Sequence, residues 1–196
     1  IVISDGKEFR MKLIYLSNLI YSKGILHLLR AVVSLNENLH GQTQIELRVY
    51  GRLMSDQYMH SSKLAIELSE FSDKKYISIN PPVGRSDVSR VLEEADVFVL
   101  PTFYESEAFP VSVLEAIRFN CKIILSHHNY LSDIFVNYNI IWASTESVSS
   151  LIIAIKAAIN MSDKLVEENR YRVIEENSFS AFSVDVQLLL NRLLER

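Results

Sequence analysis

The sequence predicts an α/β protein in which helices wind around a parallel sheet of about six strands, followed by extra C-terminal helices. Short apolar runs alternate with longer amphipathic segments, which is the pattern of repeated β-α units. The run Val97–Leu100 is apolar on both faces, as expected of a parallel strand that helices cover on two sides. The rules for right-handed crossovers then favour the strand order 3-2-1-4-5-6.

The first half of the chain predicts three of these strands. They are expected over residues 11–16, 44–50 and 76–79. The first helix is expected to open at Lys23-Gly24, because apolar residues recur at helical spacing after it: Ile25, Leu28, Leu29, Val32, Val33 and Leu35. A second helix is expected over residues 55–71, with Tyr58 on its buried side, and a third over residues 87–94.

The second half is organised around a β-α-β unit. The strand Val97–Leu100 leads into a polar, aromatic loop and then a helix expected over residues 111–119. Pro110 suits the first helical position, because its fixed φ favours a helix start and its missing N–H is not needed there. Asn120 can form a left-handed cap after this helix, and the next strand is expected over residues 121–125.

Two carboxylates frame the start of that helix. Glu107 lies just ahead of it and Glu115 in its second turn, with seven residues between them. Ligands of open parallel sheets bind at the carboxyl ends of strands, and a helix start attracts anions. Both side chains can reach such a ligand, because helical side chains lean toward the N-terminus. The spacing alone favours a simpler interpretation, in which Glu115 is a solvated surface residue.

The remaining segments predict a last strand over residues 140–143 and helices over residues 147–160, 163–177 and 182–196. Ser144 or Thr145 is expected to cap the first of these helices. The adjacent His127 and His128 have no further ligand at metal-binding spacing, so no metal site is predicted.

Composition narrows the class of protein. The chain has 196 residues, 48% of them hydrophobic and 22% charged, which suits one compact domain. A net charge of −4 argues against a nucleic-acid partner, which would need a basic face. The single Cys121 cannot form an internal disulfide and is expected to be buried. No apolar run is long enough to span a bilayer.

The stretch from Pro101 to Ala116 resembles the donor-site signature of retaining family 4 glycosyltransferases, which have the GT-B fold. Its elements stand in the family's order: Pro101-Thr102, Glu107-Ala108-Phe109-Pro110 and Glu115-Ala116. The family usually has glycine at Ala108. The resemblance covers nearly the whole chain and implies the Rossmann-like, C-terminal half of a GT-B protein. It makes residues 1–10 an interdomain linker remnant and residues 11–196 a nucleotide-sugar donor-binding domain.

The resemblance also assigns residues to the donor's diphosphate. The segment 17–24 resembles the family's phosphate-binding Gly-Arg-x-x-x-x-Lys-Gly, with Lys23 matching and Asn18 in place of arginine. Lys23 and the helix start at Phe109–Val111 would stabilise the leaving diphosphate, although Pro110 contributes no N–H. Ala108, Phe109, Pro110 and Val111 would all be donor-binding residues. Asn18 can still donate an amide N–H. These cationic and N–H groups would act without a metal or cofactor.

Other roles follow from the same resemblance. Glu107 would contact the transferred sugar and, with Lys23, be a catalytic residue, whereas Glu115 would bind the ribose hydroxyls. Val83 and Gly84 would hold the nucleobase through backbone groups. The family's Gly-Gly loop after the fifth strand is replaced by Asn129-Tyr130, which puts its backbone contacts to the donor in doubt.

The implied protein is a glycosyltransferase that transfers a sugar from a nucleoside diphosphate to an acceptor hydroxyl in polysaccharide or lipopolysaccharide biosynthesis. An N-terminal acceptor-binding domain would be missing, so this chain alone would turn over little. The expected location is cytoplasmic, with any peripheral membrane contact made through the missing half. Two alternatives remain: a non-catalytic nucleotide-sugar or partner-binding module, and another GT-B-like enzyme such as a sugar-nucleotide epimerase or a phosphorylase.

Overall fold

The computed structural model describes residues 9–38, 43–107 and 109–176 of the chain. Six parallel strands form one sheet in the order β3-β2-β1-β4-β5-β6, which confirms the predicted order. The strands are β1 (Phe9–Leu16), β2 (Thr43–Tyr50), β3 (Ile77–Asn80), β4 (Val97–Leu100), β5 (Lys122–Ser126) and β6 (Ile141–Ala143).

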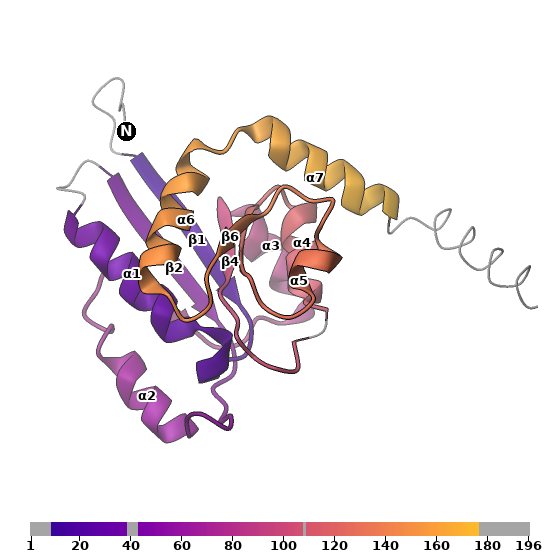
Figure 1. Cartoon of the computed structure of the whole chain (residues 1–196). Coiled ribbons are helices and arrows are strands. Elements are labelled where there is room, and N and C mark those ends of the chain that lie inside the picture. The colour runs from indigo at the N-terminus through magenta and orange to yellow at the C-terminus, as the bar shows by residue number, and fades with distance from the viewer. Residues whose placement is uncertain (1–8, 39–42, 108, 177–196) are drawn as a thin grey trace, which may run out of the picture.

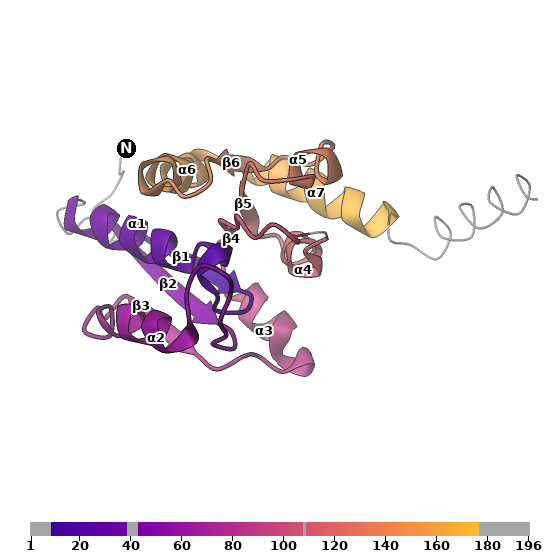
Figure 2. The ribbon, with the colours of Figure 1, turned by 60° about the horizontal axis from the view of Figure 1, so that its bottom comes forward.

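Helices flank this sheet (Figure 1). They are α1 (Ile25–Asn38), α2 (Ser61–Ser69), α3 (Val88–Glu93), α4 (Val111–Arg118), α5 (Leu131–Ile134), α6 (Val148–Asn160) and α7 (Asp163–Glu176). Two 3-10 turns, η1 (Tyr21–Lys23) and η2 (Arg85–Asp87), precede α1 and α3. Far apart in sequence, α1 and α6 lie side by side in both ribbon views, and α4 packs beside α7 (Figure 2). The predicted helix over residues 182–196 lies outside the described residues.

The core is centred on the middle strands. β1 and β2 pair along their whole length, from Phe9 opposite Thr43 to Leu16 opposite Tyr50. All four residues of β4 are buried, which confirms that helices cover this strand on both faces. Phe9 and Arg10, placed in the linker by the sequence, are strand residues, and residues 1–8 lie outside the described chain.

The predicted start of the second helix was wrong. Asp56 accepts hydrogen bonds from the backbone N–H groups of Tyr58 (3.0 Å) and Met59 (2.8 Å), which forms a turn where a helix was expected. His60 then caps α2 by accepting the N–H of Ser62. Tyr58 therefore lies in the preceding loop with 48% of its surface exposed, instead of on a buried helix face.

The cap of α6 also differs from the prediction. Ser147, not Ser144 or Thr145, accepts the N–H of Ser150 through its hydroxyl at 3.1 Å. At the end of α4, Asn120 has a φ of 59°, which confirms the predicted left-handed conformation.

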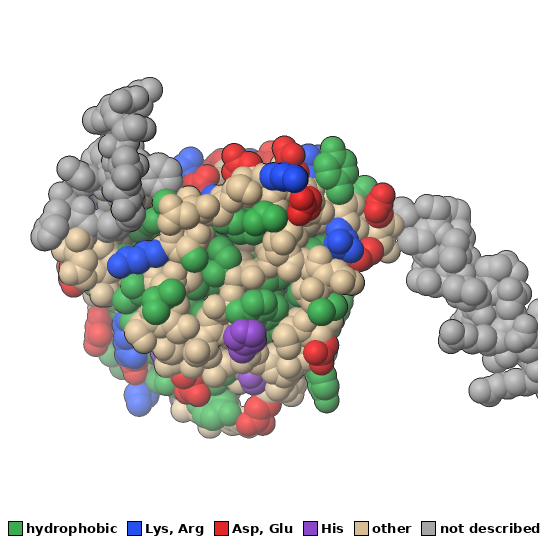
Figure 3. Space-filling model, turned by 45° about the horizontal axis from the view of Figure 1, so that its top comes forward, with side chains coloured by type: hydrophobic (Ala, Val, Ile, Leu, Met, Phe, Trp, Pro, Cys, Tyr) green, Lys and Arg blue, Asp and Glu red, His purple; other side chains and the backbone are tan. Residues whose placement is uncertain are grey.

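None of the helices in residues 9–38, 43–107 and 109–176 has the length and apolar character needed to cross a membrane. On the face shown in Figure 3, acidic and basic side chains are scattered mainly around the rim, and no basic stripe crosses its described part.

Candidate functional site

Two loops meet at the carboxyl edge of the sheet, one after β1 and one after β4. Because β1 and β4 are neighbours, their loops leave the sheet side by side. The N–H of Phe103 donates to the carbonyl of Ser22 at 2.7 Å and joins the loops directly. Gly24 has a φ of 76°, and a Cβ there would lie 2.1 Å from the carbonyl oxygen of Pro101. Only glycine fits this approach, which explains the glycine after Lys23.

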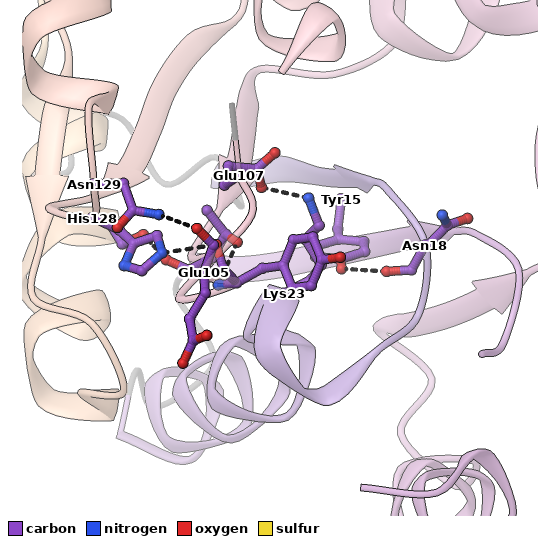
Figure 4. A network of polar contacts seen from close by, with 10 residues as sticks. Tyr15, Asn18, Lys23, Glu105, Glu107, His128 and Asn129 are labelled. Carbon is purple, nitrogen blue, oxygen red and sulfur yellow. Dashed lines mark hydrogen bonds and ion pairs between the residues drawn. The ribbon is translucent and has the colours of Figure 1, made fainter. Parts of the chain in front are cut away.

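Lys23 and Glu107 form an ion pair across these loops (Figure 4). Their side chains are 13% and 7% exposed, so both charges are largely removed from water. The Lys23 ammonium also lies 5.2 Å from the ring centre of Tyr104, in reach of a cation–π interaction. The structure therefore brings together the two residues that the sequence proposed as catalytic.

A tight turn directs Glu107 toward Lys23. The N–H of Glu107 donates to the carbonyl of Tyr104 at 2.9 Å, and the N–H of Tyr104 donates to the Thr102 hydroxyl at 3.1 Å. Glu105 lies on the outside of this turn, where its carboxylate accepts the Tyr58 hydroxyl at 3.0 Å. The turn thus separates an exposed carboxylate from a buried one only two residues further on.

Asp56 anchors the loop that carries Lys23. Its carboxylate accepts the N–H of Ser22 at 2.7 Å. Partial burial opposes ionisation, but hydrogen bonds from Ser22, Met59 and Tyr58 hold the pKa of Asp56 below its usual value. This contact could not be predicted from the sequence, because it depends on a loop conformation.

An aromatic cluster surrounds a buried histidine beside the same loop. The His27 ring lies 5.9 Å from Tyr21 and 5.8 Å from Phe103, measured between ring centres. Burial and the nearby Arg30 lower the pKa of His27, against an opposing effect of Glu146. Within the described residues, His27 Nδ1 has no hydrogen-bond partner.

The residues expected around the helix start are placed as follows. Pro110 is the N-cap of α4, one position earlier than expected, and its carbonyl accepts the N–H of Val113 at 2.9 Å. Phe109 and Val111 are more than half exposed at this helix end. Glu115 is half-buried on α4, and its carboxylate has no hydrogen bond or ion pair to the described part of the chain. Ala108 lies outside the described residues.

Three other expected donor residues lie away from the ion pair. Asn18 is exposed and points away from Lys23 (Figure 4), while its carbonyl accepts the Tyr15 hydroxyl at 2.9 Å. Val83 and Gly84 follow β3, an outer strand, at the same edge of the sheet. Within the described residues, no hydrogen bond or ion pair joins Asn18, Val83 or Gly84 to Lys23 or Glu107.

Both histidines after β5 have packing or hydrogen-bonding partners. The His127 ring stacks on Trp142 at 4.8 Å between centres, and His128 Nε2 contacts the carbonyl of Tyr104 at 2.8 Å. Among the described residues, no three His, Cys, Asp or Glu side chains are grouped so as to hold a metal ion.

Comparison with known proteins adds a family match. The family model described as "Glycosyl transferases group 1" matches residues 4–178. A curated relative, N,N'-diacetylbacillosaminyl-diphospho-undecaprenol alpha-1,3-N-acetylgalactosaminyltransferase from Campylobacter jejuni, is 30% identical over 113 residues. That match covers 57% of this chain and 28% of the relative, so the chain spans well under half of its length.

Solved structures share the fold. Anabaena HepE in complex with UDP-glucose has a TM-score of 0.74 at 11% identity, covering 93% of this chain and 49% of that one. The C-terminal domain of a group 1 family glycosyl transferase from Francisella tularensis has a TM-score of 0.62 at 15% identity, covering 85% of both chains. At these identities the likeness establishes the Rossmann-like GT-B fold and not the ligand.

Proposed function

Because this chain belongs to the glycosyl transferases group 1 family, we propose that it is the domain of a glycosyltransferase that binds the nucleoside-diphosphate sugar donor. The observation that carries the proposal is the Lys23–Glu107 pair, which joins the loop after β1 to the loop after β4. Glu107 belongs to the second loop, which leads to the start of α4. A cation, a carboxylate and a helix start at this edge suit a ligand that joins an anion to a sugar.

The pair suggests an exchange of partners when the donor binds. In the free protein, Glu107 neutralises the Lys23 ammonium. A diphosphate brings stronger negative charge, so Lys23 would bind it in place of Glu107. The released carboxylate could then accept hydrogen bonds from sugar hydroxyls. Each residue thus has a partner before and after binding, and neither charge is left buried alone.

The proposed reaction transfers the sugar from the diphosphate to the acceptor. The bond from the anomeric carbon to the diphosphate oxygen breaks, and a bond to the acceptor hydroxyl oxygen forms as that hydroxyl loses its proton. Lys23 and the N–H groups at the start of α4 stabilise the leaving diphosphate, which allows transfer without a metal. Glu115 binds the ribose, and the anomeric configuration is retained.

The acceptor is proposed to bind a separate domain. The chain spans 49% of the HepE chain and 28% of the Campylobacter relative, whose name gives a lipid-linked saccharide as acceptor. By analogy, the full protein would extend a saccharide in polysaccharide or lipopolysaccharide biosynthesis. It would work in the cytoplasm, with any membrane contact made by the part absent here.

Donor binding can be tested on this chain directly. A panel of nucleoside diphosphates and their sugars is added, and thermal unfolding and calorimetry are recorded. At least one nucleotide should raise Tm, and Glu115→Ala should remove most of that rise. Glu175→Ala, which alters an exposed helical glutamate on α7, should leave the rise unchanged. Absence of binding by every nucleotide in the panel would overturn the proposal.

A donor-binding module without transfer activity is the second candidate. It is favoured by Asn18, which is exposed and supplies no second cation beside Lys23. Assaying the full-length protein with the donor that this chain binds, with and without acceptor, separates the candidates. Sugar transfer identifies the enzyme, whereas binding without turnover identifies the module. A changed sugar without acceptor would indicate an epimerase, and a phosphate requirement a phosphorylase.

A further inference from the structure

Side chains at the end of β5 hold the loop that carries Glu107. Each donates a hydrogen bond to a different backbone carbonyl of that loop, and Figure 4 shows the contacts of His128 and Asn129. The contacts are Ser126 Oγ to Thr102, His128 Nε2 to Tyr104 at 2.8 Å, and Asn129 Nδ2 to Glu105 at 2.8 Å. We call these three residues the carbonyl clamp. A carbonyl only accepts, so Nε2 is the nitrogen of His128 that carries hydrogen here.

The sheet and one unusual backbone conformation make the clamp possible. β4 and β5 are neighbours that end together, with Leu100 opposite Leu125, so their loops run alongside each other. Asn129 has a φ of 47°, a left-handed conformation that asparagine tolerates better than most residues. The clamp thus depends on the side chains of a loop that lacks the family's glycines.

The clamp connects to Glu107 through one peptide group. The carbonyl of Tyr104 accepts both the ring N–H of His128 and the backbone N–H of Glu107. The ring of the same Tyr104 lies over the Lys23 ammonium. A shift of this peptide would therefore move the Glu107 carboxylate and the aromatic face beside Lys23 together.

We propose that His128 and Asn129 are positioning residues that hold Glu107 where its carboxylate can accept hydrogen bonds from the sugar of the donor. The inference rests on the proposed function and extends it to two side chains, His128 and Asn129, to which neither the family match nor the relatives' names give a role. Neither side chain needs to touch the donor. Their effect should fall on the sugar, which Glu107 contacts, more than on the nucleoside diphosphate, which Lys23, Glu115 and the α4 start bind.

The test compares two affinities for each variant. Calorimetry gives Kd for the nucleoside diphosphate that binds best and for its sugar, and the ratio reports the contribution of the sugar. His128→Phe keeps an aromatic ring but removes the N–H that donates to Tyr104. Asn129→Asp keeps the side-chain shape and still tolerates the left-handed backbone, but it places a carboxylate against the carbonyl of Glu105. Both should lower the preference for the sugar-bearing ligand about tenfold. His128→Gln, which restores an N–H donor, should stay within about twofold of wild type.

A second measurement does not need the ligand. Hydrogen exchange of the Glu107 amide, which is bonded to Tyr104, should accelerate in His128→Phe and return toward wild type in His128→Gln. This readout remains informative if one variant is too unstable for calorimetry. Asn129→Gly, which keeps the backbone conformation and removes the donor, provides a milder third variant.

Each outcome bears on a different claim. If wild type binds both ligands and the variants keep the same preference, the positioning role is wrong while the donor site stands. Equal weakening of both ligands by His128→Phe and His128→Gln would also contradict it. If wild type binds no nucleotide at all, the donor site itself is wrong, and this inference falls with it.

Discussion

Lys23 and Glu107 are 84 residues apart in the sequence, yet they form a largely buried ion pair between two loops at the carboxyl edge of the sheet. Each charge is the main partner of the other in the described structure, so the two charges neutralise each other when no ligand is bound. Under the proposed function, a diphosphate that binds Lys23 would take the place of Glu107, which would couple the stability of this pair to binding.

Replacing one member of the pair should lower the free energy of unfolding strongly, whereas replacing both members together should lower it much less. Lys23→Met leaves a carboxylate buried without a cation, and we expect the free energy of unfolding to fall by about 3 kcal/mol. Adding Glu107→Leu to that variant should recover much of the loss, because no unpaired charge remains. Urea unfolding of both single variants and the double variant measures this, and strictly additive losses would contradict it.

His27 should make stability depend on pH. Burial lowers its pKa in the folded state, so the unfolded chain binds the proton more readily. Stability is then full above the unfolded pKa of about 6.5 and is lost as pH falls toward the folded value. Urea midpoints measured between about pH 7 and pH 5 should decline less in His27→Phe than in wild type. The same slope in both proteins would assign the dependence to other groups.

Asn169 should be one of the residues on which α7 docking depends. It is 1% exposed, and its amide accepts the N–H of Asn139 at 2.7 Å and donates to the carbonyl of Asn139 at 3.0 Å. Asn169→Leu leaves both backbone groups unpaired and should cost about 2–3 kcal/mol of unfolding free energy. Asn169→Asp keeps the acceptor oxygen but sets a buried carboxylate against the carbonyl of Asn139, so near neutral pH it should cost at least as much. An unfolding free energy of Asn169→Leu equal to that of wild type, measured by urea unfolding, would contradict this account.

Cys121 should not react with alkylating reagents in the folded protein. Burial, with a smaller effect from Asp96, raises the pKa of its thiol to about 12. Because the thiolate is the reactive form, alkylation at about pH 8 should proceed only through unfolding. Labelling monitored by mass spectrometry should accelerate with urea in step with the loss of helical signal. Fast labelling without denaturant would show an accessible thiol.

Much of the fold could be predicted from apolar patterning. The buried run of β4 and the alternation of strand and helix segments led to the observed strand order, because a parallel sheet with right-handed crossovers allows few arrangements. The resemblance to family 4 glycosyltransferases, carried by the order of matching residues, also selected Lys23 and Glu107, which the structure brings together.

The features that could not be predicted are contacts between side chains and backbone groups in loops. Tyr58 matched a helix pattern, but Asp56 forms a turn there, and this competing hydrogen bonding is invisible to hydrophobic periodicity. The contacts of His128 and Asn129 span 24 residues and depend on a left-handed backbone at Asn129. The sequence indicated only that glycines were absent from this loop.

The most direct test of the donor site is a crystal structure of this chain with its nucleoside-diphosphate sugar bound. We expect the Lys23 ammonium to have left Glu107 for a diphosphate oxygen and the Glu107 carboxylate to accept a sugar hydroxyl, with the diphosphate at the start of α4. A nucleotide bound elsewhere while the Lys23–Glu107 pair stays intact would contradict the account.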